Sequence, residues 1–173
     1  MNILICPDKF KGSLTARQVC DAVADGIRVI LPQAVIDSVP MADGGEGTCE
    51  LLTQWHQGRM VEVDVQGPLF CPVKARYGIS GDGSTAFIEM AEASGLTLLK
   101  PEERNPLLTS SVGTGEMIAD AMHRGVTNII LGIGGSATND AGIGMASALG
   151  YVVLDAGGVK NPVSTLRSIA HNL

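Results

Sequence analysis

A glycine-rich stretch that directly follows an apolar run constrains the fold of this chain more than any other feature. The run Ile129-Ile130-Leu131 is typical of a strand that is buried on both faces of a sheet. Residues 132–144 follow it with the sequence GIGGSATNDAGIG, and residues 145–149 favour a helix. A strand, a glycine-rich turn and a helix in this order predict an α/β protein in which ligands bind at the carboxyl ends of parallel strands.

The glycine-rich stretch also predicts a binding site for an anion. Glycines let the backbone approach a ligand and expose its N–H groups, and the N-terminus of a helix favours phosphate. Gly134 and Gly135 would supply such N–H groups, and Ser136, Thr138 and Asn139 add side-chain donors. We therefore expect these five residues to contact a phosphate-bearing ligand.

Asp140 places a carboxylate beside the expected phosphate, and the two negative charges would repel each other. A cation between them removes the conflict, as Mg²⁺ does between carboxylates and nucleotide phosphates. The alternative is a simple turn in which Asn139 or Asp140 caps the helix, but glycines within that helix, Gly142 and Gly144, each cost about 1 kcal/mol relative to alanine. Because Asn caps a helix as well as Asp does, Asp140→Asn is expected to leave stability nearly unchanged.

The composition excludes several classes of protein. Of the 173 residues, 45% are hydrophobic and 3% aromatic, which predicts a sizeable aliphatic core. A net charge of −6 without a cluster of lysines and arginines argues against nucleic acid and anionic membranes as partners. No apolar run is long enough to span a bilayer. The four cysteines lack CxxC spacing, which argues against zinc and disulfides and favours a reducing, cytoplasmic location.

The order of the expected elements divides the chain into parts. Residues 1–59 read as strand, loop, helix, strand, loop and helix, and the α/β rhythm resumes over 90–155, with a strand at 151–154. We expect these segments to form a Rossmann- or flavodoxin-like parallel sheet. Between them, residues 60–89 alternate apolar and polar side chains, which predicts a small inserted antiparallel β segment.

Two of the other loops are weaker candidates for a site. The loop after the first strand holds Asp8 and Lys11, and a lysine beside a phosphate can act as an electrostatic clamp. An ordinary solvated loop explains these charges equally well. Thr114 either caps a helix or donates its hydroxyl to a ligand, and the sequence leaves both interpretations open.

The loop after the second strand, ADGGEGT at residues 42–48, is a stronger candidate. Its glycines, Gly44 and Gly45 among them, allow the backbone to fold around a small ligand. Its two acids, Asp43 and Glu46, can hold Mg²⁺ or a sugar-like hydroxyl group. A turn with one solvated capping acid is the alternative, and it does not account for the whole string.

A different class of protein fits part of the same stretch. The spacing Gly132-x-Gly134-x-x-Ala137 satisfies the loose fingerprint of dinucleotide-binding proteins, and Asp155 follows near the distance expected for a ribose contact. Asp140 would then face a pyrophosphate directly. A dinucleotide-dependent oxidoreductase therefore stays the alternative, whereas a P-loop kinase is excluded because no Walker A lysine pattern is present.

Five ordered strings resemble those of the bacterial type I glycerate kinase family. They are PDKFKGSL at residues 7–14, ADGGEGT at 42–48, EMAEASGL at 89–96, SVGTGE at 111–116 and GGSATND at 134–140. The resemblance implies ATP-dependent phosphorylation of D-glycerate, usually at the 2-hydroxyl, in glyoxylate or sugar-acid metabolism. It also implies a two-domain α/β protein, and members of the family are much longer than this chain. Residues 156–173 would then begin a region whose remainder is missing, and the truncated chain would be inactive alone.

The resemblance also implies roles for the candidate residues. Asp140, Asp43 and Lys11 become the catalytic candidates, and the two acids are also the candidate Mg²⁺ ligands, with the base and the metal ligand not distinguished. Lys9 stands where the family motif often has serine, so no role is transferred to it. ATP and D-glycerate are the expected partners, homo-oligomerisation is left open, and the expected binding residues are Asp8, Gly44, Gly45, Glu46, Thr114, Gly134, Gly135, Ser136, Thr138 and Asn139.

Overall fold

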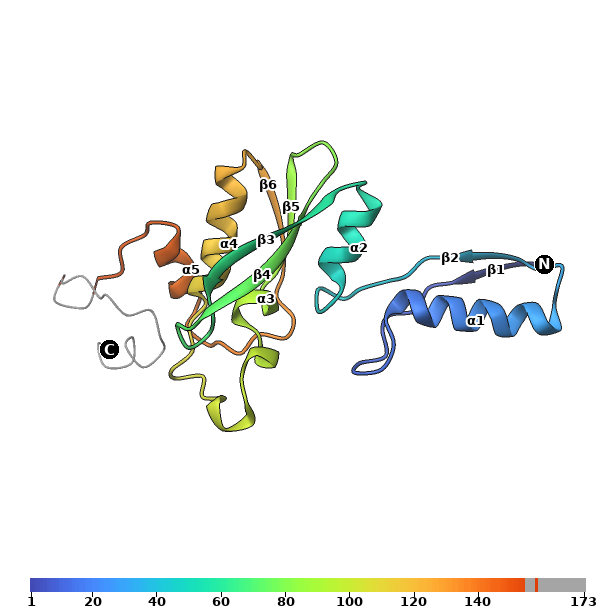
Figure 1. Cartoon of the computed structure of the whole chain (residues 1–173), viewed down its shortest axis with the longest axis horizontal. Coiled ribbons are helices and arrows are strands. Elements are labelled where there is room, and N and C mark those ends of the chain that lie inside the picture. The colour runs from blue at the N-terminus through green and yellow to red at the C-terminus, as the bar shows by residue number, and fades with distance from the viewer. Residues whose placement is uncertain (155–157, 159–173) are drawn as a thin grey trace. The chain divides into compact units, whose positions relative to one another are not determined.

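The computed structural model describes residues 1–154 and residue 158 (Figure 1). The chain divides into two compact units, Met1–Asp43 and Gly44–Leu173, and each is described by itself. Among the described residues, none of the helices combines the length and the apolar character needed to cross a membrane.

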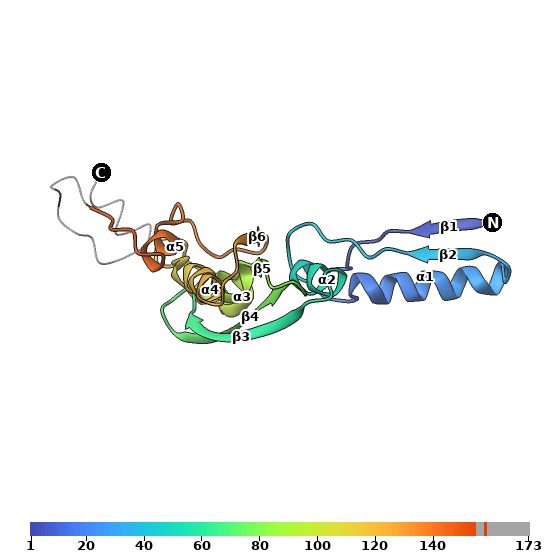
Figure 2. The ribbon, with the colours of Figure 1, turned by 90° about the horizontal axis from the view of Figure 1, so that it is seen from above.

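The first unit is a β-α-β arrangement. Strands β1 (Asn2–Ile5) and β2 (Val35–Ser38) pair in parallel, and helix α1 (Ala16–Ile30) connects them and lies along the pair (Figure 2). Helix α1 begins where Thr15 forms a capping box with Gln18, which satisfies donors at the helix N-terminus. Its core is small and consists of Ile5, Cys20 and Ala24 with the apolar side chains packed around them.

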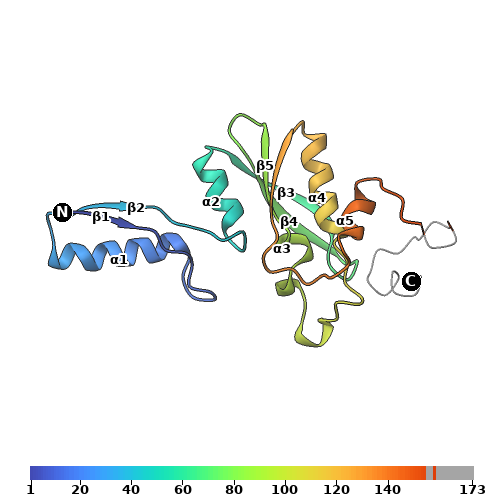
Figure 3. The ribbon, with the colours of Figure 1, turned by 180° about the vertical axis from the view of Figure 1, so that it is seen from behind.

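The second unit is built on a four-stranded mixed sheet in the order β3-β4-β5-β6 (Figure 3). Strands β3 (Arg59–Gln66), β4 (Pro72–Ile79) and β5 (Thr85–Glu89) pair antiparallel, as the alternating pattern predicts. Strand β6 (Asn128–Gly132) pairs with β5 in parallel. The parallel pair ends with Glu89 opposite Gly132, so the segments that leave β5 and β6 start side by side.

Helices cover both faces of this sheet. Thr53 of α2 (Thr48–Trp55) lies against Gly78 on one face, where the Thr53 hydroxyl leaves no room for a Cβ atom. Neighbouring side chains of a strand point to opposite faces, and Tyr77 accordingly donates to Asp120 of α4 (Val112–His123) at 2.6 Å. The remaining described helices are α3 (Ala91–Ser94), α5 (Ile143–Ala148) and the 3₁₀ turns η1 (Leu96–Leu98) and η2 (Pro101–Glu103).

The α/β class is confirmed, with parallel strand pairs in a mixed fold. The parallel pairs lie in two separate sheets, however, and residues 60–89 supply strands to the sheet that contains β6. The strand expected at 151–154 is wrong, because only Leu154 makes an isolated bridge there. The assignment of 1–59 with 90–155 to one part and of 60–89 to an insertion stays a prediction. The predicted start of a further region at 156–173 and the ribose-contact candidate Asp155 lie outside the described residues.

Candidate functional site

The two glycine-rich stretches of the second unit touch each other directly. The N–H of Gly134 donates to the carbonyl oxygen of Gly44 at 3.2 Å. A Cβ atom added to Gly132 would lie 2.5 Å from the Gly44 carbonyl oxygen, and one added to Gly134 would lie 2.7 Å from the Cα of Gly45. Side chains cannot fit at such distances, so the glycines are required by contact between two segments of backbone.

Thr48 holds the 44–48 segment in its folded form. Its hydroxyl donates to the carbonyl oxygen of Gly45 at 2.6 Å and accepts from the N–H of Gly44 at 3.1 Å. Gly44 and Gly47 adopt positive φ angles of 90° and 92°, which glycine reaches without strain. The predicted turn is therefore present, and it leads directly into α2.

A third string, residues 89–96, lies along the same glycine loop. The N–H of Met90 donates to the carbonyl oxygen of Gly132 at 2.8 Å, and that of Leu96 donates to Gly135 at 2.9 Å. In return, the N–H of Ala137 donates to the carbonyl oxygen of Ser94 at 2.8 Å. These backbone bonds fix one side of the loop to the end of the sheet.

Asp140 connects the loop to a fourth string. Its side chain is 2% exposed, and its carboxylate accepts five hydrogen bonds. Ser111 donates to Oδ2 from both its N–H and its hydroxyl at 2.8 Å, and Ser110 and Gly144 add donors at 3.5 and 3.2 Å. The N–H of Gly142 donates to Oδ1 at 3.1 Å. Asp140 therefore ties the start of α4 to the start of α5.

The hydroxyl of Ser111 extends this connection, because it also accepts from the N–H of Met145 at 3.0 Å. Gly144 has no room for a side chain, since a Cβ atom would lie 2.3 Å from the Ser110 hydroxyl and 2.8 Å from the Asp140 carboxylate. A simple helix cap did not account for a glycine at position 144 inside α5. Close packing of Gly144 around the buried Asp140 carboxylate accounts for it.

Thr114 does not cap a helix, because α4 begins two residues earlier at Val112. The residue is fully buried, and its hydroxyl shares a 2.8 Å hydrogen bond with Ser94. Thr109 donates to the carbonyl oxygen of Ala137 at 2.8 Å from the same region. The binding role of Thr114 stays a prediction, and its contacts favour packing between α3 and α4.

Some donors of the glycine loop stay open. Within the described part of the chain, the backbone N–H groups of Gly135 and Asn139 meet no acceptor, and both residues are exposed. The Ser136 hydroxyl contacts that of Thr138 at 3.0 Å and accepts from the Thr138 N–H at 3.1 Å. The loop therefore presents part of the donor set that the sequence predicts, and its remaining donors stabilise the fold.

In the first unit, Lys9 lies between two of the predicted acids. Its ammonium group is 3.9 Å from Asp8 and 3.7 Å from Asp43, distances of ion pairs rather than of short hydrogen bonds. The Lys9 side chain is 20% exposed, whereas that of Asp43 is 71% exposed. The loops after β1 and β2 thus converge as expected for parallel strands, and they add a lysine that was given no role. Lys11 of this unit is exposed, and so is Glu46 of the second unit.

A Mg²⁺ site is not preformed by protein side chains alone. Among the described residues, no three or more His, Cys, Asp and Glu side chains gather in a way that could hold a metal. Mg²⁺ in phosphoryl-transfer sites needs only one or two carboxylates besides the phosphates. The oxygens of Asp140 already accept hydrogen bonds, so the exposed Asp43 fits such a role better, and both assignments stay predictions.

Sequence reasoning did not predict the contacts of several residues that hold this region together: Glu89, Ser94, Thr109, Ser110 and Ser111. All five are buried polar residues, 0 to 6% exposed. Each flanks or lies within a string that the sequence singled out. The signal that marks them is a polar residue next to a glycine-rich or apolar segment, which the sequence alone does not distinguish from a solvated loop residue.

Glu89 has a perturbed pKa. Burial raises the pKa of its carboxyl above the usual 4.5, and the nearby carboxylates of Glu92 and Glu46 raise it further, whereas hydrogen bonds from backbone N–H groups oppose the shift. Burial likewise raises the pKa of the Cys49 thiol to about 11. All four cysteines are free thiols.

The comparisons with known proteins agree with these observations. The sequence profile described as the glycerate kinase family matches residues 3–171. The chain belongs to the glycerate kinase family. It is 55% identical over 155 residues to the glycerate kinase of Haemophilus influenzae, covering 90% of this chain and 41% of that protein. It is 56% identical over 158 residues to the glycerate 2-kinase of Escherichia coli K12, covering 91% of this chain and 42% of that protein.

A solved structure gives the same result for the fold. The crystal structure of a protein assigned as glycerate kinase 2 from Salmonella typhimurium LT2 matches with a TM-score of 0.79 and 52% sequence identity. The match covers 92% of this chain and 43% of that chain. The chain thus spans less than half the length of these relatives. Membership of a kinase family favours the kinase interpretation over the dinucleotide-dependent oxidoreductase.

The contacts of Asp140 change the expected effect of Asp140→Asn. An asparagine has one acceptor oxygen, and its NH₂ group would face N–H or O–H donors that now bind the carboxylate. We expect the free energy of unfolding to fall by about 1–3 kcal/mol, the cost of leaving buried hydrogen-bonding groups unpaired. Chemical denaturation measures this change. Asp64→Asn, which alters a side chain that is 78% exposed, is the control and should change stability by less than about 0.5 kcal/mol; equal stability of both variants would contradict the account.

The raised pKa of Glu89 predicts a pH dependence of stability. The folded state holds the Glu89 proton more tightly than the unfolded state does, so the wild type loses stability as pH rises from below 4.5 through the folded pKa. Glu89→Gln carries no titrating group at this position. The stability of Glu89→Gln relative to wild type should therefore rise between about pH 4 and pH 7. Denaturation at each pH checks this, and a difference that does not vary with pH, or that falls, would show that the pKa is not raised.

Proposed function

We propose that this chain is part of a glycerate kinase, which transfers the γ-phosphoryl group of ATP to a hydroxyl group of D-glycerate. Family membership and relatives named as glycerate kinases support this reaction class. The relative from Escherichia coli is named a glycerate 2-kinase, which favours the 2-hydroxyl as the acceptor. We infer that the enzyme is cytoplasmic and acts in glyoxylate or sugar-acid metabolism.

One structural observation supports the proposal most. The glycine loop leaves the carboxyl end of the parallel pair β5–β6, with the N–H groups of Gly135 and Asn139 exposed and without acceptors among the described residues. Ligands of parallel sheets bind at this edge, and free backbone N–H groups favour phosphate or carboxylate oxygens. We assign Gly135 and Asn139 to binding of ATP or of the glycerate carboxylate through these N–H groups, together with Ser136 and Thr138. Gly134, whose own N–H donates to Gly44, would contribute by letting the backbone approach the ligand.

We assign the acids and lysines different roles. Phosphoryl transfer depends on positioning the two substrates in line and on neutralising the charge that spreads over the phosphoryl oxygens. Lys11 would bind a phosphate or the glycerate carboxylate, and Asp43, which is mostly exposed, would accept the hydroxyl proton or hold Mg²⁺. Asp8, Gly44, Gly45, Glu46 and Thr114 complete the proposed binding residues. Mg²⁺, when bound with ATP, would neutralise phosphate charge and orient the γ-phosphoryl group.

Asp140 would act mainly by positioning. Its carboxylate accepts from backbone N–H groups at the start of α4, in the loop and at the start of α5. Direct use as a base or metal ligand requires it to leave these bonds. The proposal therefore places Asp140 behind the loop and gives Asp43 the more direct contact with substrate.

The proposal predicts what this chain does alone. Phosphoryl transfer needs closely positioned groups on both substrates, and the chain covers only 41–42% of its relatives. We expect no useful turnover in a coupled ADP-release assay with D-glycerate and Mg·ATP, under conditions in which the full-length Escherichia coli relative is active. We also expect Mg·ATP at 100 times its Kd to raise the free energy of unfolding of the chain by about 2.7 kcal/mol, and therefore to raise its Tm. NAD should leave the Tm unchanged.

Two results would contradict parts of this proposal. Turnover of about one per second or faster from the chain alone, the ordinary range of enzymes, would show that the site is complete within these residues. A Tm raised by NAD and not by Mg·ATP would favour the oxidoreductase class instead.

A further inference from the structure

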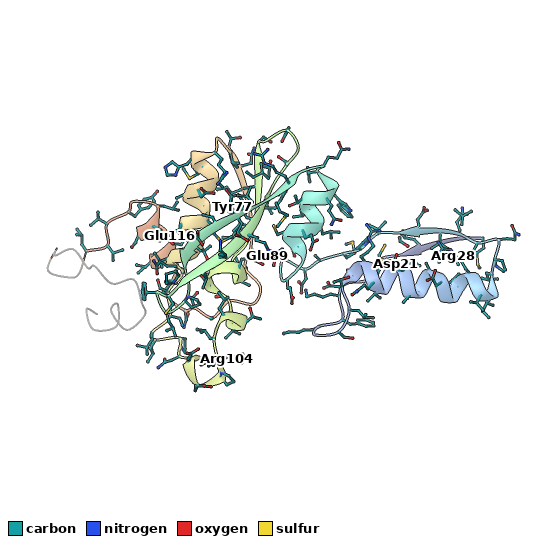
Figure 4. All side chains as sticks on the ribbon, in the orientation of Figure 1. Asp21, Arg28, Tyr77, Glu89, Arg104 and Glu116 are labelled. Atoms are coloured by element: carbon teal, nitrogen blue, oxygen red, sulfur yellow. The ribbon has the colours of Figure 1, made fainter. Side chains whose placement is uncertain are left out.

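Glu89 is a buried acid to which the proposed reaction assigns no role. It is the last residue of β5 (Figure 4), it lies opposite Gly132 in the register, and the residue is 6% exposed. A buried carboxyl is costly unless its oxygens accept hydrogen bonds. Its partners therefore indicate what it contributes.

Those partners lie at the start of α2. The Oε1 atom of Glu89 accepts from the N–H of Cys49 at 2.7 Å, and the N–H of Gly47 also interacts with the carboxyl. Helix α2 begins at Thr48 after Gly47, and Gly47 has no side chain that could cap it. The first N–H groups of a helix need acceptors from outside the helix. Glu89 supplies one from a strand that lies 40 residues further along the chain.

The same helix start is the end of the glycine-rich 44–48 segment. That segment enters α2 directly, and at its other end Gly44 and Gly45 pack against Gly132 and Gly134. Glu89 lies next to Gly132 on the neighbouring strand. One carboxyl thus fixes the distance between the segment and the carboxyl edge of the β5–β6 pair, where the glycine loop begins.

We propose that Glu89 is a positioning residue for the 44–48 segment, and that it holds this segment at the glycine loop in the arrangement that binds substrate. The part that concerns substrate rests on the proposed kinase function. The part that concerns position does not, because the hydrogen bonds are made within the chain. Glu46 is exposed on the same segment, next to Gly47. The hydrogen bonds that Glu89 accepts from Gly47 and Cys49 would therefore also place Glu46 where it can contact substrate.

The neighbouring charged groups do not stabilise Glu89 in its buried position. The charged groups that act on it are the carboxylates of Glu92 on α3 and of Glu46. These interactions oppose ionisation of Glu89, so an ion pair is not what holds the residue in place. The hydrogen bonds to the start of α2 are the favourable interactions that remain.

Amide hydrogen exchange measured by NMR on this chain tests the proposal. Glu89→Met has a similar volume and no oxygen acceptor, whereas Glu89→Gln keeps a carbonyl oxygen. In Glu89→Met we expect the Cys49 amide to exchange at least about tenfold faster, the factor for losing one strong hydrogen bond. Glu89→Gln should bring the rate back to within a few-fold of wild type. Glu92→Gln is the control. It removes a neighbouring charge, and the Glu92 Oε2 atom accepts from the backbone N–H of Arg76 and not from α2, so the exchange rate of the Cys49 amide should stay unchanged.

The amides of the β3–β4 pair provide an internal reference. Faster exchange at Gly47 and Cys49 in Glu89→Met with an unchanged β3–β4 pair, together with recovery in Glu89→Gln, supports the positioning role. Unchanged exchange at Cys49 in Glu89→Met, or equally faster exchange throughout the sheet, would overturn it. Because amide exchange needs no kinase activity, the positioning role is decided separately from the proposed function.

Stabilisation of the chain by Mg·ATP tests whether the role extends to ligand binding. Weaker stabilisation in Glu89→Met, with stabilisation at the wild-type level in Glu89→Gln, would extend the role to ligand binding. Equal stabilisation in both variants would overturn that extension.

Discussion

The second unit depends on a contact between two segments of backbone that carry no side chains. Gly132 and Gly134 lie so close to the backbone of Gly44 and Gly45 that neither of them has room for a Cβ atom. This contact joins the 44–48 segment to the glycine loop that follows β6. Thr48 and Glu89 stabilise the 44–48 segment through hydrogen bonds, and the backbone bonds of the 89–96 string stabilise the glycine loop. The glycines thus serve the packing of the protein itself before they serve any ligand.

Asp140 plays the corresponding role on the far side of the glycine loop. A single buried carboxylate satisfies donors from the start of α4, from the loop and from the start of α5. Satisfying several donors with one group is stable only when all of them are present, since an unpaired group in such a network is costly. Hydrogen bonds therefore fix the loop at both ends, and its middle, around Gly135 and Asn139, is exposed and is the part that we propose binds a ligand.

The sequence predicted much of this and failed for definite physical reasons. Apolar runs and glycine positions predicted β6, the loop and α5, because local pattern determines them. The partners of Asp140 and Glu89 were missed, because they lie 29 and 40 residues away and no local pattern reports such contacts. Apolar residues at 151–154 predicted a strand, but a strand needs a neighbour to pair with, and only Leu154 makes a bridge. Glycines read as ligand contacts were partly packing contacts, which sequence does not distinguish.

The most direct test of this account is the stability of Gly134→Ala, compared with Gly26→Ala as the control. Neither glycine has a positive φ, but an added Cβ meets the backbone of Gly45 at 2.7 Å in the first case and nothing within 4 Å in the second. With unfolding followed by the fluorescence of Trp55, the single tryptophan, Gly134→Ala should lower the free energy of unfolding by about 1–3 kcal/mol, and Gly26→Ala should not lower it. A Gly134→Ala variant within about 0.5 kcal/mol of wild type would show that the two glycine-rich segments do not depend on this contact.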